Sequence, residues 1–140
     1  VAVLLFNTKG ELLVVKQTYN GRWSVTGGVV DENESPQTAG IRETKEEIGI
    51  QLDTIQFLGV AYVPKIDDIV EGLEFLFHGG TLSDDQVAAI VLEENEIDEY
   101  KFLPISDALG IVRKSLQWRI PICLEALKTG TPVYFEYKGE

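Results

Sequence analysis

Short apolar runs separated by polar turns dominate this chain, a pattern typical of a sheet with connecting helices. Apolar runs at 1–6 and 11–17 flank Asn7-Thr8-Lys9-Gly10, whose residue types predict a hairpin turn. Further strands are predicted at 23–26, at 50–63 with a kink near Gly59, and at 72–78, 100–103 and 132–137.

Helical spacing of apolar residues predicts helices at 36–48, around 105–112, and at 122–127 with an end at Gly130. Gly79-Gly80 is expected to turn the chain into the acidic stretch 83–99, and 64–70 to form a charged loop. Strands before, between and after helices favour a mixed α/β fold, an α/β/α sandwich around a mixed β-sheet. At 140 residues we expect one domain over 1–140.

The helix at 36–48 has the clearest signals and an unusual charge pattern. Ser35 is placed to cap it, Pro36 takes its first position, and Gly49 ends it. Glu46 and Glu47 lie roughly 60° and 40° to either side of Glu43, so the three glutamates share one face. Arg42 flanks that face and can reach Glu46. The adjacent stripe is the one apolar enough to face a core, and it comprises Gly40, Ile41, Thr44 and Ile48.

Two interpretations of this acidic face compete. Most charge runs are simply solvated, but like charges three and four residues apart destabilise a helix. A hard divalent cation such as Mg²⁺ relieves that crowding, because it takes oxygen ligands. Glu43, Glu46 and Glu47 are therefore the candidate metal ligands, and the flexible Gly27-Gly28 pair can bring the Gly28 carbonyl toward the same ion.

The same residues fill a longer pattern, G-x5-E-x7-R-E-x-x-E-E-x-G-[aliphatic], over 28–50. This pattern resembles the signature box of the Nudix hydrolases. Two positions depart from it: Thr44 stands in a slot that is normally aliphatic, and Val25-Thr26 stands where Leu-Pro is common. Neither change removes a candidate ligand.

The resemblance implies a Nudix fold and hydrolysis of a nucleoside diphosphate linked to another group, with divalent metal and water. Bound Mg²⁺, or Mn²⁺ in its place, would reverse the sign of a carboxylate site that otherwise repels a polyanion. Arg42 is expected to orient the glutamates, and Glu34 to hold the loop against the helix. ADP-ribose and other nucleotide sugars, dinucleoside polyphosphates and nucleoside triphosphates all remain open as substrates.

Three residues upstream of the box are candidates for contacting substrate. Lys16 and Arg22 could bind phosphate, although surface cations are more often without such a role. Trp23 could stack on a base, with a core position as the competing interpretation. His78 has no Ser or Cys partner by pattern, so a catalytic triad is not supported. Cys123 has the helical spacing of a core residue.

The base that activates water has two candidate sources. The box glutamates would be bound to metal, which lowers their pKa and makes them poor proton acceptors. The acidic stretch before 100–103 carries Glu93, Glu94 and Glu96, and Glu96 is favoured because its Glu-Ile step resembles the family's style there. Solvated loop charge is the competing interpretation.

Composition limits the partners. The formal net charge of −11 argues against duplex nucleic acid and favours a small-molecule nucleotide. One cysteine fits a reducing cytoplasm, and no apolar run reaches the ~20 residues of a membrane span. The lack of methionine and a start inside an apolar run predict that some native N-terminal sequence is missing. The choice between monomer and homodimer is left open.

Two alternative functions compete with hydrolysis. A non-catalytic nucleotide-binding Nudix module would be expected to have lost a box glutamate, and this chain retains all three. An acidic calcium-binding domain of the EF-hand type would need closely spaced Asp/Asn ligands on a loop, and no such loop is present.

Overall fold

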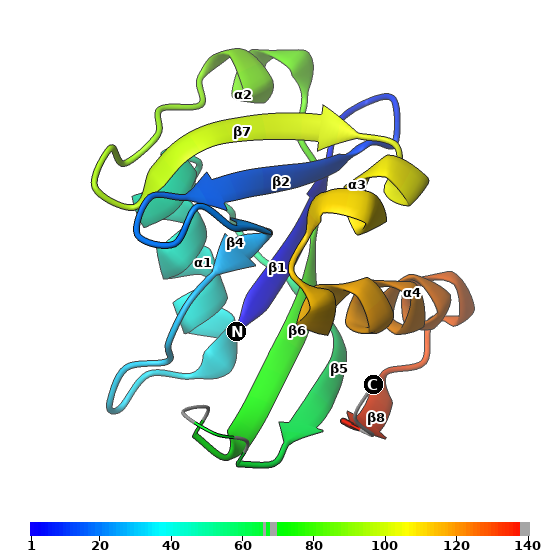
Figure 1. Ribbon diagram of the computed structural model, residues 1–140. Coiled ribbons are helices and arrows are strands. Elements are labelled where there is room, and N and C mark those ends of the chain that lie inside the picture. The colour runs from blue at the N-terminus through cyan, green and yellow to red at the C-terminus, as the bar shows by residue number, and fades with distance from the viewer. Residues whose placement is uncertain (66, 68–69, 138–140) are drawn as a thin grey trace.

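A mixed sheet forms the centre of the molecule, with α1 against one face and α3 and α4 against the other (Figure 1). The computed structural model describes residues 1–65, 67 and 70–137. Its elements in chain order are β1 (Ala2–Phe6), β2 (Leu12–Gln17), β3 (Trp23–Ser24), β4 (Thr26–Gly27), α1 (Pro36–Ile48), β5 (Gln56–Val63), β6 (Gly72–Thr81), α2 (Asp84–Ala88), β7 (Ile97–Leu103), α3 (Ile105–Ile111), α4 (Lys114–Thr129) and β8 (Val133–Glu136). The expected α/β/α sandwich is confirmed.

The eight strands found among the described residues lie in the order β3-β2-β1-β6-β5-β8, with β4 paired to β1 and β7 to β2. β1 runs parallel to β6 and β5 parallel to β8, whereas the other pairs are antiparallel. The predicted β1–β2 hairpin is confirmed. Its turn is closed by the Asn7 side chain, which accepts hydrogen bonds from the main-chain nitrogens of Lys9 and Glu11 at 3.1 and 2.9 Å.

β1 is buried on both faces, which explains why its sequence is a continuous apolar run. Ala2, Leu4 and Phe6 pack into the core beneath α3 and α4. Val3 and Leu5 point the other way, into the core that contains Ile48 at the end of α1 and the loop after it. This central strand therefore joins the two cores.

α1 begins and ends where the sequence predicts. The Ser35 side chain accepts from the Thr38 nitrogen at 3.1 Å, and Gly49 adopts the left-handed conformation, φ 75°, while donating to the Lys45 carbonyl. Of the predicted core stripe, Gly40, Thr44 and Ile48 are buried and Ile41 is half-buried.

The two departures from the box pattern touch each other. The buried Thr44 hydroxyl lies 2.9 Å from the Gly40 carbonyl oxygen and 3.5 Å from the Thr26 hydroxyl. Thr26 in turn donates to the Val3 carbonyl at 3.2 Å. The two threonines thus satisfy their hydroxyls within the core at the junction of α1, β4 and β1.

Several predicted boundaries were wrong. β5 begins at Gln56, because Ile50, Leu52 and Ile55 are buried in a non-strand segment that packs on the α1 side of the sheet. The expected kink near Gly59 is confirmed as a shift of register between Phe57 and Gly59. The expected loop 64–70 falls partly on residues 66, 68 and 69, which lie outside those described.

The second half of the chain is also more regular than expected. α2 lies within the acidic stretch and is capped by Ser83 and Gln86 in a reciprocal pair. β7 begins three residues before the predicted start, because its extra residues pair with β2. α4 begins at Lys114, not near 122, and contains Pro121. None of the described helices has the length and apolar character needed to cross a bilayer.

Gly79 and Gly80 do not turn the chain, as was predicted, but lie inside β6 at a bulge. Leu4 pairs with His78 and Leu5 with Gly80, so Gly79 is the extra residue. A Cβ on Gly79 would lie 2.5 Å from Leu5 Cδ2 and 2.8 Å from Val3 Cγ1. Glycine is therefore required here by packing against the central strand.

We expect Gly79→Ala to lower the free energy of unfolding by about 1–3 kcal/mol, because the new methyl group overpacks β1. Gly72→Ala on the same strand is the matched control, since a Cβ there meets nothing within 4 Å. Urea denaturation of both variants checks this. Equal free energies of unfolding of the two variants would show that β1 moves to accommodate the new methyl group at no cost.

Candidate functional site

The acidic face of α1 contains carboxylates in three different environments. Glu47 is 5% exposed, whereas the side chains of Glu43 and Glu46 are 14% and 49% exposed. The three glutamates therefore share one face of the helix, as predicted. That face is exposed to solvent at Glu46 and buried at Glu47. Glu47 belongs to the buried side of the helix, beside Thr44 and Ile48.

Arg42 holds the carboxylates and the preceding loop together. Its guanidinium donates to Glu34 at 2.7 and 2.9 Å, to Glu43 at 3.0 Å and to Glu46 at 3.1 Å. It also donates to the Val29 carbonyl at 3.1 Å. The hydrogen bond from Arg42 lowers the pKa of Glu34 to about 2. The Arg42 guanidinium therefore joins the loop to the helix, and its orienting role and the structural role of Glu34 stay predictions.

The Glu47 carboxyl is buried, and other carboxylates lie near it. Burial raises the pKa of Glu47 to about 8, and the negative charges of Glu43, Glu96 and Glu46 act in the same direction. The hydrogen bond from the Gly27 nitrogen to its carboxylate, 2.7 Å long, opposes the shift only in part. Burial also raises the pKa of Glu43. At neutral pH this site holds a proton or requires a cation.

Gly28 lies directly against Glu43. A Cβ on Gly28 would lie 2.4 Å from Glu43 Oε1, so only glycine allows this approach. Its carbonyl accepts a hydrogen bond from the Val1 nitrogen at 2.9 Å, and its nitrogen donates to the Val1 carbonyl at 3.0 Å. One lone pair of the Gly28 carbonyl is thus used within the sheet, and a second remains.

A divalent metal fits the chemistry of this donor set. Within the described residues, no three acidic, His or Cys side chains are gathered into a ready cation site. Arg42 donates hydrogen bonds to both Glu43 and Glu46. The crowded oxygens and the raised pKa of Glu47 nevertheless create a demand for positive charge. The residues that would hold the ion are those expected from the sequence: Glu43, Glu46, Glu47 and the Gly28 carbonyl.

Glu96 lies in the loop that covers the end of α1. Val91 and Glu93 donate main-chain hydrogen bonds to the carbonyls of Ile48 and Glu47, at 3.0 and 3.1 Å. Glu96 is exposed, and its charge contributes to the raised pKa values of Glu43 and Glu47. The Glu93 carboxylate instead accepts from Asn95 of its own loop. Of the three loop glutamates, Glu96 is the one whose charge acts on both Glu43 and Glu47.

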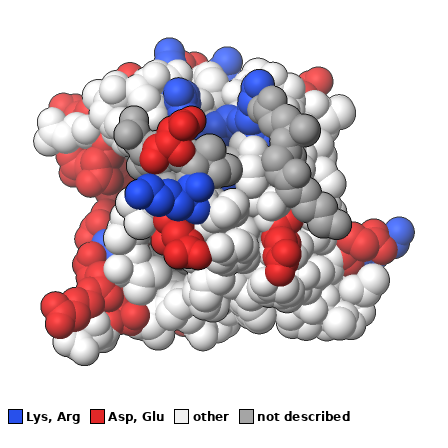
Figure 2. All heavy atoms as spheres, turned by 60° about the horizontal axis from the view of Figure 1, so that its bottom comes forward, with Lys and Arg blue, Asp and Glu red and all other residues white. Residues whose placement is uncertain are grey.

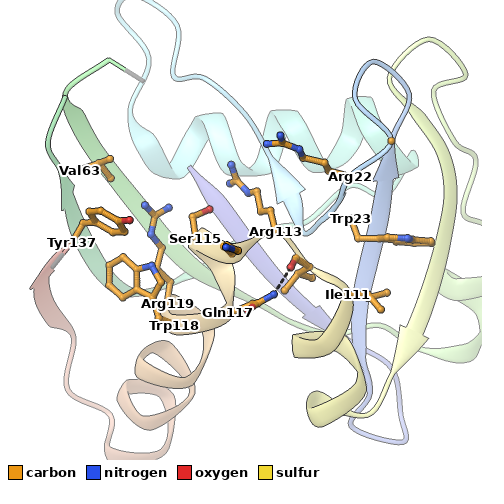
Figure 3. A pocket seen from close by; sticks show the side chains of 13 residues that line it. Arg22, Trp23, Val63, Ile111, Arg113, Ser115, Gln117, Trp118, Arg119 and Tyr137 are labelled. Carbon is orange, nitrogen blue, oxygen red and sulfur yellow. Dashed lines mark hydrogen bonds between the residues drawn. The ribbon is translucent and has the colours of Figure 1, made fainter. Parts of the chain in front are cut away.

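A pocket of about 1100 Å³ opens near the α1 face, between the β2–β3 connection, the start of α4 and the ends of β5 and β8 (Figure 3). The Val1 nitrogen lies within electrostatic reach of Glu43 and also of Arg113 and Arg119, so the chain just before β1 lies near both the carboxylates and the pocket. The pocket is lined by Gly21, Arg22, Trp23, Val63, Ile111, Val112, Arg113, Lys114, Ser115, Gln117, Trp118, Arg119 and Tyr137.

The three upstream candidates separate in space. Arg22 lines the pocket and lies close enough to Arg113 to lower its pKa, after burial, which is the main cause. The Trp23 ring points toward β7, away from the arginines (Figure 3), and Lys101 Nζ lies 5.0 Å from its centroid. Its half-buried ring packs against the apolar core, which favours the structural interpretation. Lys16 is half-buried on β2 and does not line the pocket.

Sequence reasoning missed Arg113, Trp118 and Arg119. All three lie in the part of α4, with its cap, that was not expected to be helical. Cys123 is buried in the core, as expected, and His78 packs against Phe6 with its ring centroid 5.6 Å away.

The family model of the NUDIX domain matches residues 1–124. The chain belongs to the Nudix family. An RNA pyrophosphohydrolase from Hydrogenovibrio crunogenus is 39% identical over 59 residues, which are 42% of this chain and 36% of that protein. The match thus spans about a third of the length of that relative.

Solved Nudix structures share the fold. The MutT protein of Methanosarcina mazei Go1 has a TM-score of 0.72 at 23% identity, over 92% of this chain and 91% of that one. The NUDIX domain of Shewanella oneidensis NrtR, solved with ADP ribose, has a TM-score of 0.73 at 19% identity, over 90% and 85%. At these identities the likeness shows the fold alone.

The raised pKa of Glu47 predicts how metal-free stability depends on pH. A carboxyl with a higher pKa in the folded state stabilises the fold fully below its unfolded pKa, 4.5, and loses this contribution as the pH rises toward about 8. In EDTA, the wild type should lose up to about 1.4 kcal/mol per pH unit relative to Glu47→Gln between pH 5 and 8.

Urea denaturation at several pH values measures that difference. Saturating Mg²⁺ should diminish it, because the ion replaces the proton on Glu47. Parallel pH profiles of the wild type and Glu47→Gln in EDTA would show that the Glu47 carboxyl is not perturbed.

Proposed function

We propose that this Nudix domain hydrolyses a phosphoanhydride bond in a nucleoside diphosphate linked to another group, using a divalent metal at the α1 face. One observation carries the proposal. The intact box places a buried acid, Glu47, with a pKa near 8, beside Glu43 and Glu46, and the fold alone gives no reason for such a cost.

Each residue of the site has a role in this proposal. Glu43, Glu46, Glu47 and the Gly28 carbonyl would hold Mg²⁺ or Mn²⁺. Such an ion, when bound, supplies positive charge. This charge would allow a polyanionic substrate to approach and would make its phosphorus more open to attack by water.

The remaining groups act on substrate and water. Arg42 keeps the glutamates and the loop in register through its contacts with Glu34, Glu43 and Glu46. Glu96 takes the proton of the attacking water, and Arg22, which lines the pocket, contacts an anionic group of the substrate. The pocket then receives the part of the substrate that extends beyond the diphosphate, because Arg113 and Arg119, which line it, act on the same Val1 nitrogen as Glu43.

The similar proteins support this class of substrate. The H. crunogenus relative is named an RNA pyrophosphohydrolase, and the NrtR domain was solved with ADP ribose. Both names involve phosphoanhydrides. We favour a free nucleotide derivative, because the net charge of −11 opposes long-range attraction of RNA.

RNA ends are the second candidate, favoured by the name of that relative. The dependence of binding affinity on salt concentration distinguishes RNA ends from a free nucleotide derivative. A small diphosphate should keep its affinity between low and physiological salt, whereas 5′-triphosphorylated RNA bound through its backbone should lose affinity steeply. A cytoplasmic location is part of the proposal, since the one cysteine, Cys123, is a buried free thiol.

Glu46→Gln is expected to lose at least ~10² in kcat, because it removes one well-placed charge from the metal site. Wild type and variant are assayed with Mg²⁺ and then Mn²⁺ on ADP-ribose, a dinucleoside polyphosphate, a nucleoside triphosphate and 5′-triphosphorylated RNA. Glu32→Gln, in the exposed loop before α1, is the matched control. Turnover of none of these by the wild type would favour a nucleotide-binding module, and full activity of Glu46→Gln would contradict the metal assignment.

Glu96→Gln should lose roughly 10²–10⁴-fold in kcat, because it removes the proton acceptor. Its Mg²⁺ affinity should change little, since Glu96 is not one of the expected ligands. Glu93→Gln and Glu94→Gln are controls of equal charge on the same loop. If all three variants keep full turnover, the base lies elsewhere in the box or is metal-bound hydroxide alone.

A further inference from the structure

The pocket beside the box is lined by arginines in a protein of strongly negative net charge. Arg22 approaches from the β2–β3 connection, and Arg113 and Arg119 from the start of α4 (Figure 3). The Arg113 nitrogen donates to the Trp23 carbonyl at 3.0 Å, which ties the two segments together. Figure 2 shows acidic side chains along the α1 side of this end of the molecule, and basic and acidic ones side by side nearer its centre.

The charges of these arginines are only partly balanced. Arg113 and Arg119 both pair with one carboxylate, that of Glu74 on β6. The Arg113–Glu74 pair is 3.6 Å apart, and Arg119 Nη1 contacts Glu74 Oε2 directly. Among the described residues, two guanidinium groups therefore share one negative charge, and the nearby Arg22 adds a further positive charge.

Holding these charges is costly for the fold. Arg119 is 3% exposed, and the Nε atoms of Arg113 and Arg119 have no hydrogen-bond partner among the described residues. Burial lowers the pKa of both arginines. An apolar residue at 119 would continue the buried stripe of Leu116 and Ile120 without this cost. The arginines are thus better explained by a ligand than by stability.

Aromatic side chains adjoin the arginines. The Trp118 ring lies 5.2 Å from the Arg119 guanidinium and 5.7 Å from the Tyr137 ring. The Trp118 Nε1 is buried and, in the described part of the chain, has no partner. This ring is also a natural reporter of events in the pocket, since Trp23 is the only other tryptophan.

We infer that Arg22, Arg113 and Arg119 form a binding site for an anionic group, a phosphate or a carboxylate, carried by the part of the substrate beyond the cleaved diphosphate. The assignment of this group to a substrate rests on the proposed function. This site favours nucleoside diphosphate derivatives whose second group carries a negative charge over derivatives that end in a neutral sugar.

Binding of simple anions to metal-free protein tests the site without turnover. Tripolyphosphate and citrate are titrated in EDTA into Trp23→Phe protein, and binding is followed by Trp118 fluorescence. Calorimetry is run in parallel, so that binding is detected even if the fluorescence of Trp118 does not change. The better of the two anions identifies phosphate or carboxylate as the preferred group. We expect saturable binding, weakened about 10-fold by Arg113→Gln and by Arg22→Ala.

The controls separate the pocket from overall charge. Lys9→Ala removes one positive charge from the exposed β1–β2 turn and should leave binding within twofold. Arg22→Lys should recover part of the affinity lost in Arg22→Ala. The proposal is overturned if neither anion binds, or if Arg113→Gln and Arg22→Ala bind as tightly as Lys9→Ala.

A matched substrate pair then distinguishes the two proposals. UDP-glucuronate and UDP-glucose differ by one carboxylate, and Arg113→Gln should lower kcat/KM about 10-fold for the former only. Absence of turnover on both, and on the wider substrate panel, would contradict hydrolysis while the anion titrations still decide the site. If kcat/KM is the same for UDP-glucuronate and UDP-glucose and is unchanged in Arg113→Gln, the anion site is contradicted but hydrolysis is not.

Discussion

The contacts of Arg42 are the constraint on which the site depends. Like charges spaced three and four apart would weaken α1 and push the acidic loop away from it. One guanidinium with hydrogen bonds to Glu34, Glu43 and Glu46 reverses this repulsion and places the loop against the helix. With the loop held there, Gly28 can lie in contact with Glu43. A lysine could not replace Arg42, because it lacks the planar set of donors.

The loop acts on the helix through its backbone. The Gly27 nitrogen donates to Glu47, and the missing side chain of Gly28 leaves room for the Glu43 carboxylate. Beneath them, the hydroxyls of Thr26 and Thr44 meet in the core, where the family pattern has Pro and an aliphatic residue. The two departures lie in one contact, so changing both leaves the carboxylates in place.

Local signals in the sequence predicted α1 and its carboxylates, because caps and helical spacing act within a few residues. Long-range contacts explain the errors. Gly79 resembles a turn residue until the packing of Leu5 against it is known. Arg119 occupies a core position in the stripe of Leu116, Ile120 and Cys123. Extending the helix back to Lys114 would have exposed that anomaly, but only the fold brings Glu74, 45 residues away, to its side.

Two opposite charge environments lie within electrostatic reach of Val1, just before β1. In the proposed function, the glutamates of α1 would repel a polyanion unless a divalent ion were bound, and the arginines of α4 would attract one without it. Because the net charge is −11, the protein as a whole gives little long-range attraction to anions. In the proposed function, recognition of a diphosphate would therefore arise at close range, from a bound ion at one end and the guanidinium groups at the other. A substrate with negative charge at both positions would use both, whereas a neutral group in the pocket would leave Arg113 and Arg119 with Glu74 as the one carboxylate that they share among the described residues.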